Sequence, residues 1–135
     1  MERFSEMKKS LNKTERLKSR KQIDKLFKEG LRLNVPLLRA FYMIKPFSVG
    51  EKGVRLQFGV GASSRSFKRA VDRNRIKRLG REAWRLQKEP FFLQLEELNK
   101  GLDVFLIYTG KELPDYQQMY AAVAEAIKKI GGKLK

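Results

Sequence analysis

The segment from Ser66 to Lys88 constrains this chain most, because its residue pattern predicts a long helix with two chemically opposite sides. At 100° per residue, apolar side chains fall on one narrow stripe made by Ile76, Leu79, Ala83 and Leu86. Mainly cationic side chains fall on the opposite side: Arg73, Asn74, Lys77, Arg78, Arg81, Arg85 and Lys88. One side of this helix can therefore pack on a core while the other presents a dense field of positive charge.

The positive charge on this predicted helix is not balanced by neighbouring acids. Between Arg65 and Lys88 the sequence has ten basic residues and two acidic ones. Arg73 and Lys77, and again Lys77 and Arg81, are like-charged pairs one turn apart. Each such pair destabilises a helix by about 0.2–0.5 kcal/mol, so we expect an anionic partner to bind this side.

Composition narrows the partner and the chemistry. The 135 residues favour one domain, and the net charge of +16 favours a nucleic-acid partner or, less often, an anionic membrane. The chain has no histidine and no cysteine, which excludes disulfides, thiolate chemistry and the usual zinc sites and removes the commonest general base. We therefore expect neither a catalytic residue nor a bound metal in the protein itself. Without an apolar run of about 18 residues, the sequence predicts no membrane span and no export, which favours the cytoplasm.

Periodicity predicts an α/β fold, an α+β sandwich in which helices pack on a mixed sheet. The expected order is αββ(β)αβα, where the strand in brackets is an optional short one. We expect residues 1–14 to form a flexible basic arm, residues 15–131 to form a single RNA-binding domain, and residues 132–135 to form a basic tail.

The boundaries of these elements follow from capping and turn residues. A first helix runs to Glu29, with Ser19 as its N-cap and Gly30 as its stop. Strands are expected at 37–45, 54–62 and 104–108, after a loop at 34–36, with a hairpin connection at 48–53. The basic helix is expected to stop before Pro90. A last helix runs from Asp115 to Ile130, with its inner side formed by Tyr116, Met119, Tyr120, Val123, Ile127 and Ile130, and ends at 131–132.

The predicted strand at 54–62 alternates strictly between two kinds of side chain. Its apolar face is formed by Val54, Leu56, Phe58, Val60 and Ala62, and its other face by Arg55, Gln57, Gly59 and Gly61. The two glycines would allow a flat or extended ligand to approach the backbone, or they mark a bulge or bend. The residues alone favour neither interpretation.

RNA is the partner that fits the basic helix best. Membrane binding would need larger apolar anchors, and sequence-specific DNA recognition usually uses a helix within an all-helical module. Many Arg and Lys side chains can instead bind RNA phosphates, with nearby aromatic residues to stack on bases. The aromatic candidates are Phe27, Phe41, Tyr42 and Phe58, each of which would by default pack in the core.

The segment Phe67–Arg81 resembles the signature of the bacterial ribonuclease P protein component. Its pattern here is Phe67-x-x-Ala70-x-x-Arg73-Asn74-Arg75-Ile76-Lys77-Arg78-x-x-Arg81, and the resemblance extends over roughly residues 14–130. Gly80 stands where that family usually has a larger residue. The loop Ser63-Ser64-Arg65-Ser66 replaces the family's two-lysine loop and is one residue longer.

The resemblance implies a subunit of an endoribonuclease whose catalytic centre is RNA, and which removes the 5′ leader of precursor tRNA with Mg²⁺ bound mainly by the RNA partner and the substrate. It also implies a left-handed strand–helix–strand crossover around the basic helix. The residues expected to bind the catalytic RNA are Arg65, Lys68, Arg69, Arg73, Asn74, Arg75, Lys77, Arg78, Arg81 and Arg85. Those expected to line a cleft for the leader, between the first helix and the sheet, are Phe27, Tyr42, Arg55 and Ser63.

Two alternatives to this function follow from the same residues. A general RNA-binding or ribosome-associated basic module would use the same cations without any role in cleavage. A stand-alone nuclease would need a cluster of acidic metal ligands, and Glu96 and Glu97, which are adjacent, diverge by 100° on a helix. The resemblance implies the catalytic RNA and precursor tRNA as partners, and we expect neither DNA nor a membrane.

Overall fold

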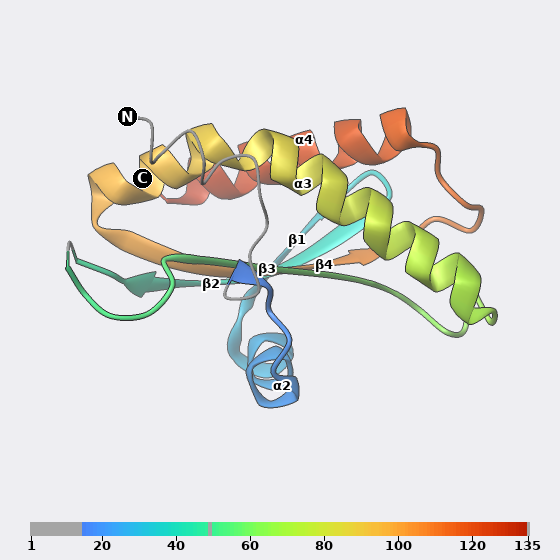
Figure 1. Cartoon of the computed structure of the whole chain (residues 1–135), viewed down its shortest axis with the longest axis horizontal. Helices are drawn as coiled ribbons and strands as arrows, with labels where there is room; N and C mark the ends of the chain where they lie inside the picture. The colour runs from blue at the N-terminus through green and yellow to red at the C-terminus, as the bar shows by residue number, and fades with distance from the viewer. Residues whose placement is uncertain (1–14, 49, 135) are drawn as a thin grey trace.

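The described residues, 15–48 and 50–134 of a computed structural model, form one four-stranded mixed sheet with helices on both faces. The elements in chain order are α2 (Arg20–Glu29), β1 (Leu31–Val35), β2 (Leu38–Pro46), β3 (Leu56–Ala62), α3 (Ala70–Leu98), β4 (Lys100–Tyr108) and α4 (Tyr116–Lys133). Helices α3 and α4 cover one face of the sheet and α2 lies on the other (Figure 1). The predicted α+β sandwich is confirmed, including the optional strand. The predicted arm at 1–14 lies outside the described residues.

The strand order is β1-β2-β4-β3, and this order corrects one predicted connection. Strand β4 pairs with β2 in antiparallel fashion and with β3 in parallel fashion, so it lies between the two strands that were predicted to form a hairpin. The loop after β2 therefore passes across the start of β4, an arrangement that local turn residues cannot reveal. The β3–α3–β4 crossover surrounds the basic helix, and its hand stays a prediction.

The actual hairpin joins β1 and β2. Val35 pairs with Leu38, which leaves Pro36 and Leu37 as a two-residue turn in which Leu37 has a φ of 73°. The N–H of Thr109 donates to the Leu37 carbonyl at 2.8 Å and ties this turn to the end of β4. The segment at 34–36, predicted as a loop, is thus mostly the end of a strand.

Helix α3 continues through Pro90 to Leu98, so the prediction that it stops before this proline is wrong. Proline removes one hydrogen bond to the carbonyl four residues earlier, which belongs to Leu86 on the exposed side, where water can bind it. Trp84, Phe91 and Leu95 are at most 2% exposed and pack in the core on both sides of the proline. Their burial holds the helix together where its backbone bonding is interrupted.

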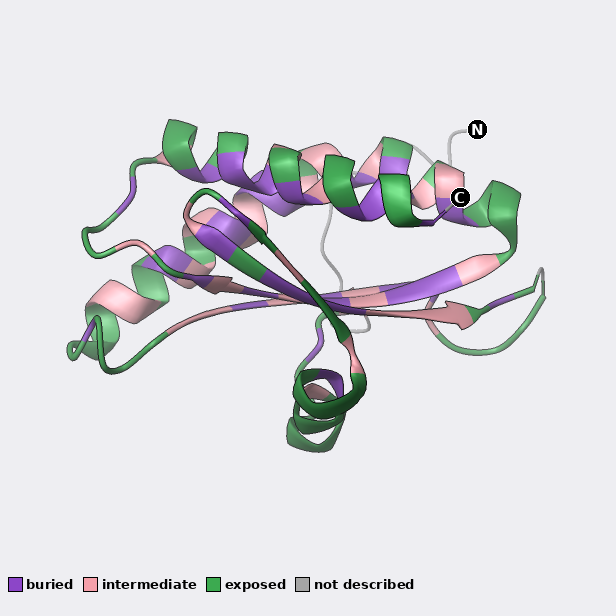
Figure 2. Cartoon of the chain, turned by 180° about the vertical axis from the view of Figure 1, so that it is seen from behind, coloured by how far each residue is buried: buried purple, intermediate pink, exposed green. Residues whose placement is uncertain are grey.

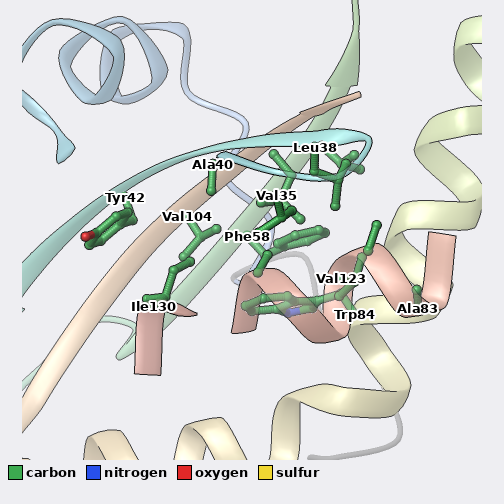
Figure 3. Packing of buried hydrophobic residues seen from close by; sticks show 14 of the residues in the cluster. Val35, Leu38, Ala40, Tyr42, Phe58, Ala83, Trp84, Val104, Val123 and Ile130 are labelled. Atoms are coloured by element: carbon green, nitrogen blue, oxygen red, sulfur yellow. The ribbon is translucent and has the colours of Figure 1, made fainter. Parts of the chain in front are cut away.

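The buried side of α3 is rotated from the predicted stripe. Ile76 and Ala83 are buried as predicted, but Leu86 is 52% exposed and Lys88, predicted on the cationic side, is 3% exposed. Trp84 takes the central place and stacks on Phe58 of β3, with ring centroids 4.2 Å apart (Figure 3). Because a single large aromatic side chain covers more of the sheet than a leucine, it determines which side of the helix faces inward.

The last helix is longer than predicted. Asp115 caps it as predicted, since its carboxylate accepts from the Gln118 N–H at 2.7 Å, but the helix passes through Gly131 and ends at Lys133. Gln94 of α3 donates to the Gly131 carbonyl at 3.0 Å, so this glycine is a contact between helices. Tyr120, predicted on the inner side, is 39% exposed.

The glycine-bearing face of β3 is covered by an aromatic ring. A Cβ at Gly59 would lie 2.6 Å from Phe105 Cδ2 of β4, and one at Gly61 would lie 3.3 Å from the same ring. The glycines thus make room for Phe105, which neither the ligand nor the bulge interpretation foresaw.

No helix in the described part of the chain is long and apolar enough to cross a membrane.

Candidate nucleic-acid interface

The exposed cations predicted to bind RNA gather on the first half of α3 and on the loop that leads into it. The exposed members of the predicted set are Arg65, Lys68, Arg69, Asn74, Arg75 and Arg78, while Arg73, Lys77, Arg81 and Arg85 are half-buried. We call the residues of this set from Arg65 to Arg81 the cationic surface. Figure 2, which views the molecule from behind, shows the first half of α3 as a mixture of exposed, half-buried and buried segments.

The loop before α3 is anchored by a buried aromatic side chain. Phe67 is 6% exposed, and its N–H donates to the Ser63 carbonyl at 2.9 Å. The Ser63 hydroxyl accepts from the Arg65 N–H at 3.1 Å. Ser63, predicted to line the leader cleft, is exposed but has this turn-forming role, and the turn leaves the Arg65 and Lys68 side chains exposed on either side of Phe67.

Arg73 joins the loop to the helix. Its Nη1 donates to the carbonyl oxygens of Phe67 at 2.7 Å and Lys68 at 2.9 Å. These hydrogen bonds use part of the guanidinium within the chain, because they satisfy carbonyls that precede the first turn of α3. Arg73 therefore orders the cationic surface, whether or not its remaining donors contact a ligand.

Arg16, which was not among the residues predicted to bind RNA, lies next to the cationic surface. The segment at 16–17 lies along the outer edge of β3, where the Leu17 N–H donates to the Phe58 carbonyl at 2.8 Å. Burial lowers the pKa of Arg81, and the positive charges of Arg16 and Arg78 lower it further. These guanidiniums lie close enough to repel one another, which is the arrangement that an anion would stabilise. The pairing of Arg16 with Phe58 places Arg16 beside α3, and this pairing could not be predicted from the sequence.

Arg85 marks the end of the cationic surface. Its guanidinium donates hydrogen bonds to the Glu82 carboxylate. Nε lies 3.3 Å from Oε2, and Nη2 lies closer to Oε1. This hydrogen bond lowers the pKa of Glu82 and raises the pKa of Arg85. Glu82 thus holds Arg85 within the chain, and the predicted contact of Arg85 with RNA stays a prediction in which RNA phosphate would compete with Glu82.

Phe27 lies on the other layer of the molecule, in an aromatic cluster formed with Phe41 and Phe105. Its ring centroid is 4.7 Å from that of Phe41 and 5.5 Å from that of Phe105. Phe27 is 38% exposed, so part of its ring can contact a ligand, while Phe41 is 7% exposed. The Arg32 guanidinium lies 6.0 Å from the Phe41 centroid, which adds positive charge beside the cluster.

Tyr42, predicted for the leader cleft, faces the opposite layer. Because side chains alternate along β2, Phe41 takes the α2 side and Tyr42 takes the α4 side, where it lies near Ile130 (Figure 3). Tyr42 is 3% exposed and burial raises the pKa of its hydroxyl. Tyr42 is a core residue. The aromatic side chains that contact Phe27 are Phe41, which the sequence already offered as a candidate, and Phe105, which the sequence interpretation missed.

Arg55 is also part of the core and not of a cleft. It is 8% exposed, and its Nη1 donates to the carbonyl oxygens of Phe47 at 3.0 Å, Leu95 at 3.3 Å and Lys100 at 2.8 Å. Its guanidinium also lies 4.8 Å from the Phe47 centroid. Arg55 therefore ties the loop after β2 to the end of α3, which explains a cation at the start of a buried strand.

The described residues contain no group of three acidic side chains placed to hold a metal ion. They also contain neither histidine nor cysteine. The site therefore combines a cationic surface on one layer with a partly exposed aromatic cluster on the other, and Arg16 lies at the sheet edge beside α3. This combination suits a phosphate backbone and unpaired bases.

Comparison with known proteins identifies the family. A family model described as Ribonuclease P matches residues 11–131. The chain belongs to the ribonuclease P protein family. It is 32% identical to the ribonuclease P protein component of Porphyromonas gingivalis, over 92% of this chain and 88% of that protein. It is 28% identical to that of Chlorobium phaeobacteroides, over 90% of this chain and 88% of that protein.

Solved structures share the fold. The RNase P protein of Staphylococcus aureus matches with a TM-score of 0.61 at 20% identity, over 86% of this chain and 94% of that one. The RNase P protein of Thermotoga maritima matches with a TM-score of 0.62 at 24% identity, over 85% and 96%. The resemblance carried by Phe67–Arg81 is thus confirmed, and the chain is a protein component of an endoribonuclease that has RNA as its partner.

Proposed function

We propose that this chain binds the catalytic RNA of ribonuclease P and the 5′ leader of precursor tRNA, and so promotes removal of the leader in the cytoplasm. The observation that carries the proposal is the separation of two surfaces on opposite layers of the sheet. The cationic surface suits the phosphates of a large folded RNA. The aromatic cluster around Phe27, with Arg32 beside it, suits a short single strand.

In this proposal the protein positions RNA and performs no bond-breaking step. The Mg²⁺ that assists hydrolysis is bound mainly by the phosphates of the RNA partner and the substrate. In support of this, the described residues offer no group of three acidic side chains that could hold a metal ion. The protein contributes positive charge that lowers the repulsion between two polyanions. Contacts to the leader add binding free energy for substrate that mature tRNA lacks.

A cleavage assay tests this function. Precursor tRNA is incubated with the catalytic RNA alone, with the protein alone and with both, at low and at physiological Mg²⁺. We expect the protein alone to cleave nothing and to increase cleavage by the RNA most at low Mg²⁺. Leader removal by the protein alone would overturn the proposal.

A second assay separates this function from that of a general RNA-binding module. With the catalytic RNA bound, the assembled complex should bind precursor tRNA more tightly than mature tRNA, and the difference should grow with leader length until the cleft is filled. Equal affinity for both tRNAs would favour the general module.

A further inference from the structure

A row of leucine side chains runs along α3, packed against the core at its N-terminal end and exposed over the rest of its length. Leu79, Leu86 and Leu93 are spaced by seven residues, which is two helical turns, so they lie in one row. Leu86 is 52% exposed and Leu93 is 43% exposed, Leu79 is half-buried, and Pro90, between the last two, is exposed. We call Leu79, Leu86 and Leu93 the leucine stripe. Core packing does not account for the exposed part of this row.

The charge beside the leucine stripe reverses along the helix. Arg75 and Arg78 are exposed on the N-terminal side of the stripe, and Glu96 and Glu97 are exposed on the C-terminal side. The second half of α3 carries the acidic residues Glu89, Glu96 and Glu97, and its one cation after Arg85 is Lys88, which is buried. RNA is therefore repelled from this half, so a partner that covers the stripe would have to be of another kind.

We propose that the leucine stripe pairs with the same stripe of a second copy of this chain, with the two α3 helices antiparallel. In this arrangement Leu86 lies on the two-fold axis against its own equivalent. Leu79 faces Leu93 of the partner subunit, and Arg75 faces Glu97 of the partner subunit. Arg78 and Glu96 form a parallel row beside the stripe and pair in the same way. Because the contact is isologous, it closes after two copies.

The charges beside the leucine stripe favour the antiparallel pair of helices over other arrangements. Parallel helices would place Arg75 against Arg75 and Glu97 against Glu97, which is unfavourable in both rows. An unrelated basic peptide could match the acidic half but would meet repulsion at Arg75 and Arg78. The chain itself carries both signs in the required order. Its net charge of +16 opposes association, but the excess lies mainly outside this contact and is screened beyond about 8 Å at physiological salt.

The inference concerns the RNA-free protein and stands apart from the proposed function. The contact is a single pair of helices, so the association is weak and depends on concentration. It also uses Arg75, a member of the cationic surface, so RNA bound there and the second copy of the chain compete for this side chain. The dimer is then the state of protein that has not yet bound RNA.

Sedimentation velocity of the RNA-free full chain tests the contact at about 0.15 M salt and up to about 1 mM protein, the weak end of measurable association. We expect the dimer fraction to rise with concentration. Leu86→Glu places two carboxylates on the two-fold axis and should weaken association at least about tenfold. Val71→Glu is the matched control, because Val71 is 58% exposed on the same helix but outside the stripe, and it should associate like the wild type.

A charge exchange makes the test specific for the antiparallel register. Arg75→Glu and Glu97→Lys should each weaken association, and the double variant should restore it, because the two ion pairs re-form with reversed sign. Circular dichroism of each variant checks that the fold is intact. A wild-type chain that stays monomeric throughout, a Leu86→Glu chain that associates like the wild type, or a double variant without restoration would each overturn the proposal.

Discussion

Gly80 of α3 lies directly against Val60 of β3, so that a Cβ at position 80 would lie 2.9 Å from Val60 Cγ2. This is the point where the basic helix crosses the sheet edge closely. Gly80 is buried, and the next residue is Arg81, which belongs to the cationic surface. The close approach therefore sets how near the cationic surface lies to the strand edge that holds Arg16.

Gly80→Ala is expected to destabilise the protein by about 1–2 kcal/mol, although alanine favours a helix by up to about 1 kcal/mol. Val60 is short and stiff, so it cannot turn away from the added methyl group and α3 must shift. The measurement is urea unfolding. Gly132→Ala is the control, because Gly132 is also helical and has nothing within 4 Å of an added Cβ, and it should be neutral or stabilising by about 0.5 kcal/mol. If Gly80→Ala were as stable as the wild type, Val60 and α3 would be able to adjust to the added methyl group without cost.

Arg78→Ala should weaken binding to the catalytic RNA and reduce its salt dependence, whereas Arg85→Ala should change both much less. Arg78 is exposed on the cationic surface, and Arg85 is held by Glu82. Each lost phosphate contact lowers the slope of log K against log salt by about 0.9 on duplex-like RNA. Filter binding at several salt concentrations measures both variants. Equal slopes for the two variants would mean that the ion pair with Glu82 opens when RNA binds.

Phe27→Ala should selectively weaken the binding of tRNA that carries a leader. A base stacked on an aromatic ring contributes about 1–3 kcal/mol, and Phe27 is the most exposed ring of the aromatic cluster. Affinities of the assembled complex for precursor and mature tRNA are compared. Tyr42→Phe is the control from the same region of the sheet, and it should leave this preference unchanged because Tyr42 faces the other layer. Equal losses for both tRNAs in Phe27→Ala would indicate a purely structural role.

Glu15→Gln should destabilise the fold by about 1–3 kcal/mol, because it removes the carboxylate charge that faces a buried ammonium group. The Lys88 ammonium lies 2.7 Å from Glu15 Oε1, and the two side chains are 4% and 16% exposed. The pair holds the segment next to Arg16 against α3, so RNA affinity should fall as well. Lys88→Met removes the charge and should cost less stability than Glu15→Gln. The opposite ranking in urea unfolding would contradict this account.

The Glu82–Arg85 ion pair should account for part of the loss of folding stability at low pH. The pKa of Glu82 is lowered in the fold from its ordinary value of 4.5, so the ionised carboxylate adds stability above that pH, and this stability is lost as the pH falls through the lowered pKa. Glu82 is 45% exposed, so the effect is small and salt-dependent. Unfolding free energies of wild type and Glu82→Gln at pH 7 and about pH 3 measure it. The variant should lose less stability between these values, and parallel losses would exclude the pair as a cause.

Local pattern was sufficient for much of this protein. The position of α2, the caps at Ser19 and Asp115, the strand at 104–108 and the exposed cations between Arg65 and Arg81 follow from residues a few positions apart. These features depend on backbone geometry and on the charge of single side chains. Predictions from local pattern were wrong where tertiary packing outweighed the local signal. At Pro90 the helix continues because Trp84, Phe91 and Leu95 pack in the core on both sides of the proline.

The candidate site shows the same division. The sequence by itself determined that one helix carries an uncompensated positive charge, that the chain has neither histidine nor cysteine, and which family signature lies between Phe67 and Arg81. Only the tertiary structure decided that Arg55 and Tyr42 are buried, that Phe41 and Phe105 join Phe27, and that Arg16 lies beside Arg81. Strand order and register bring together residues from 16 to 105, and these depend on how the whole core packs, which no local window of sequence contains.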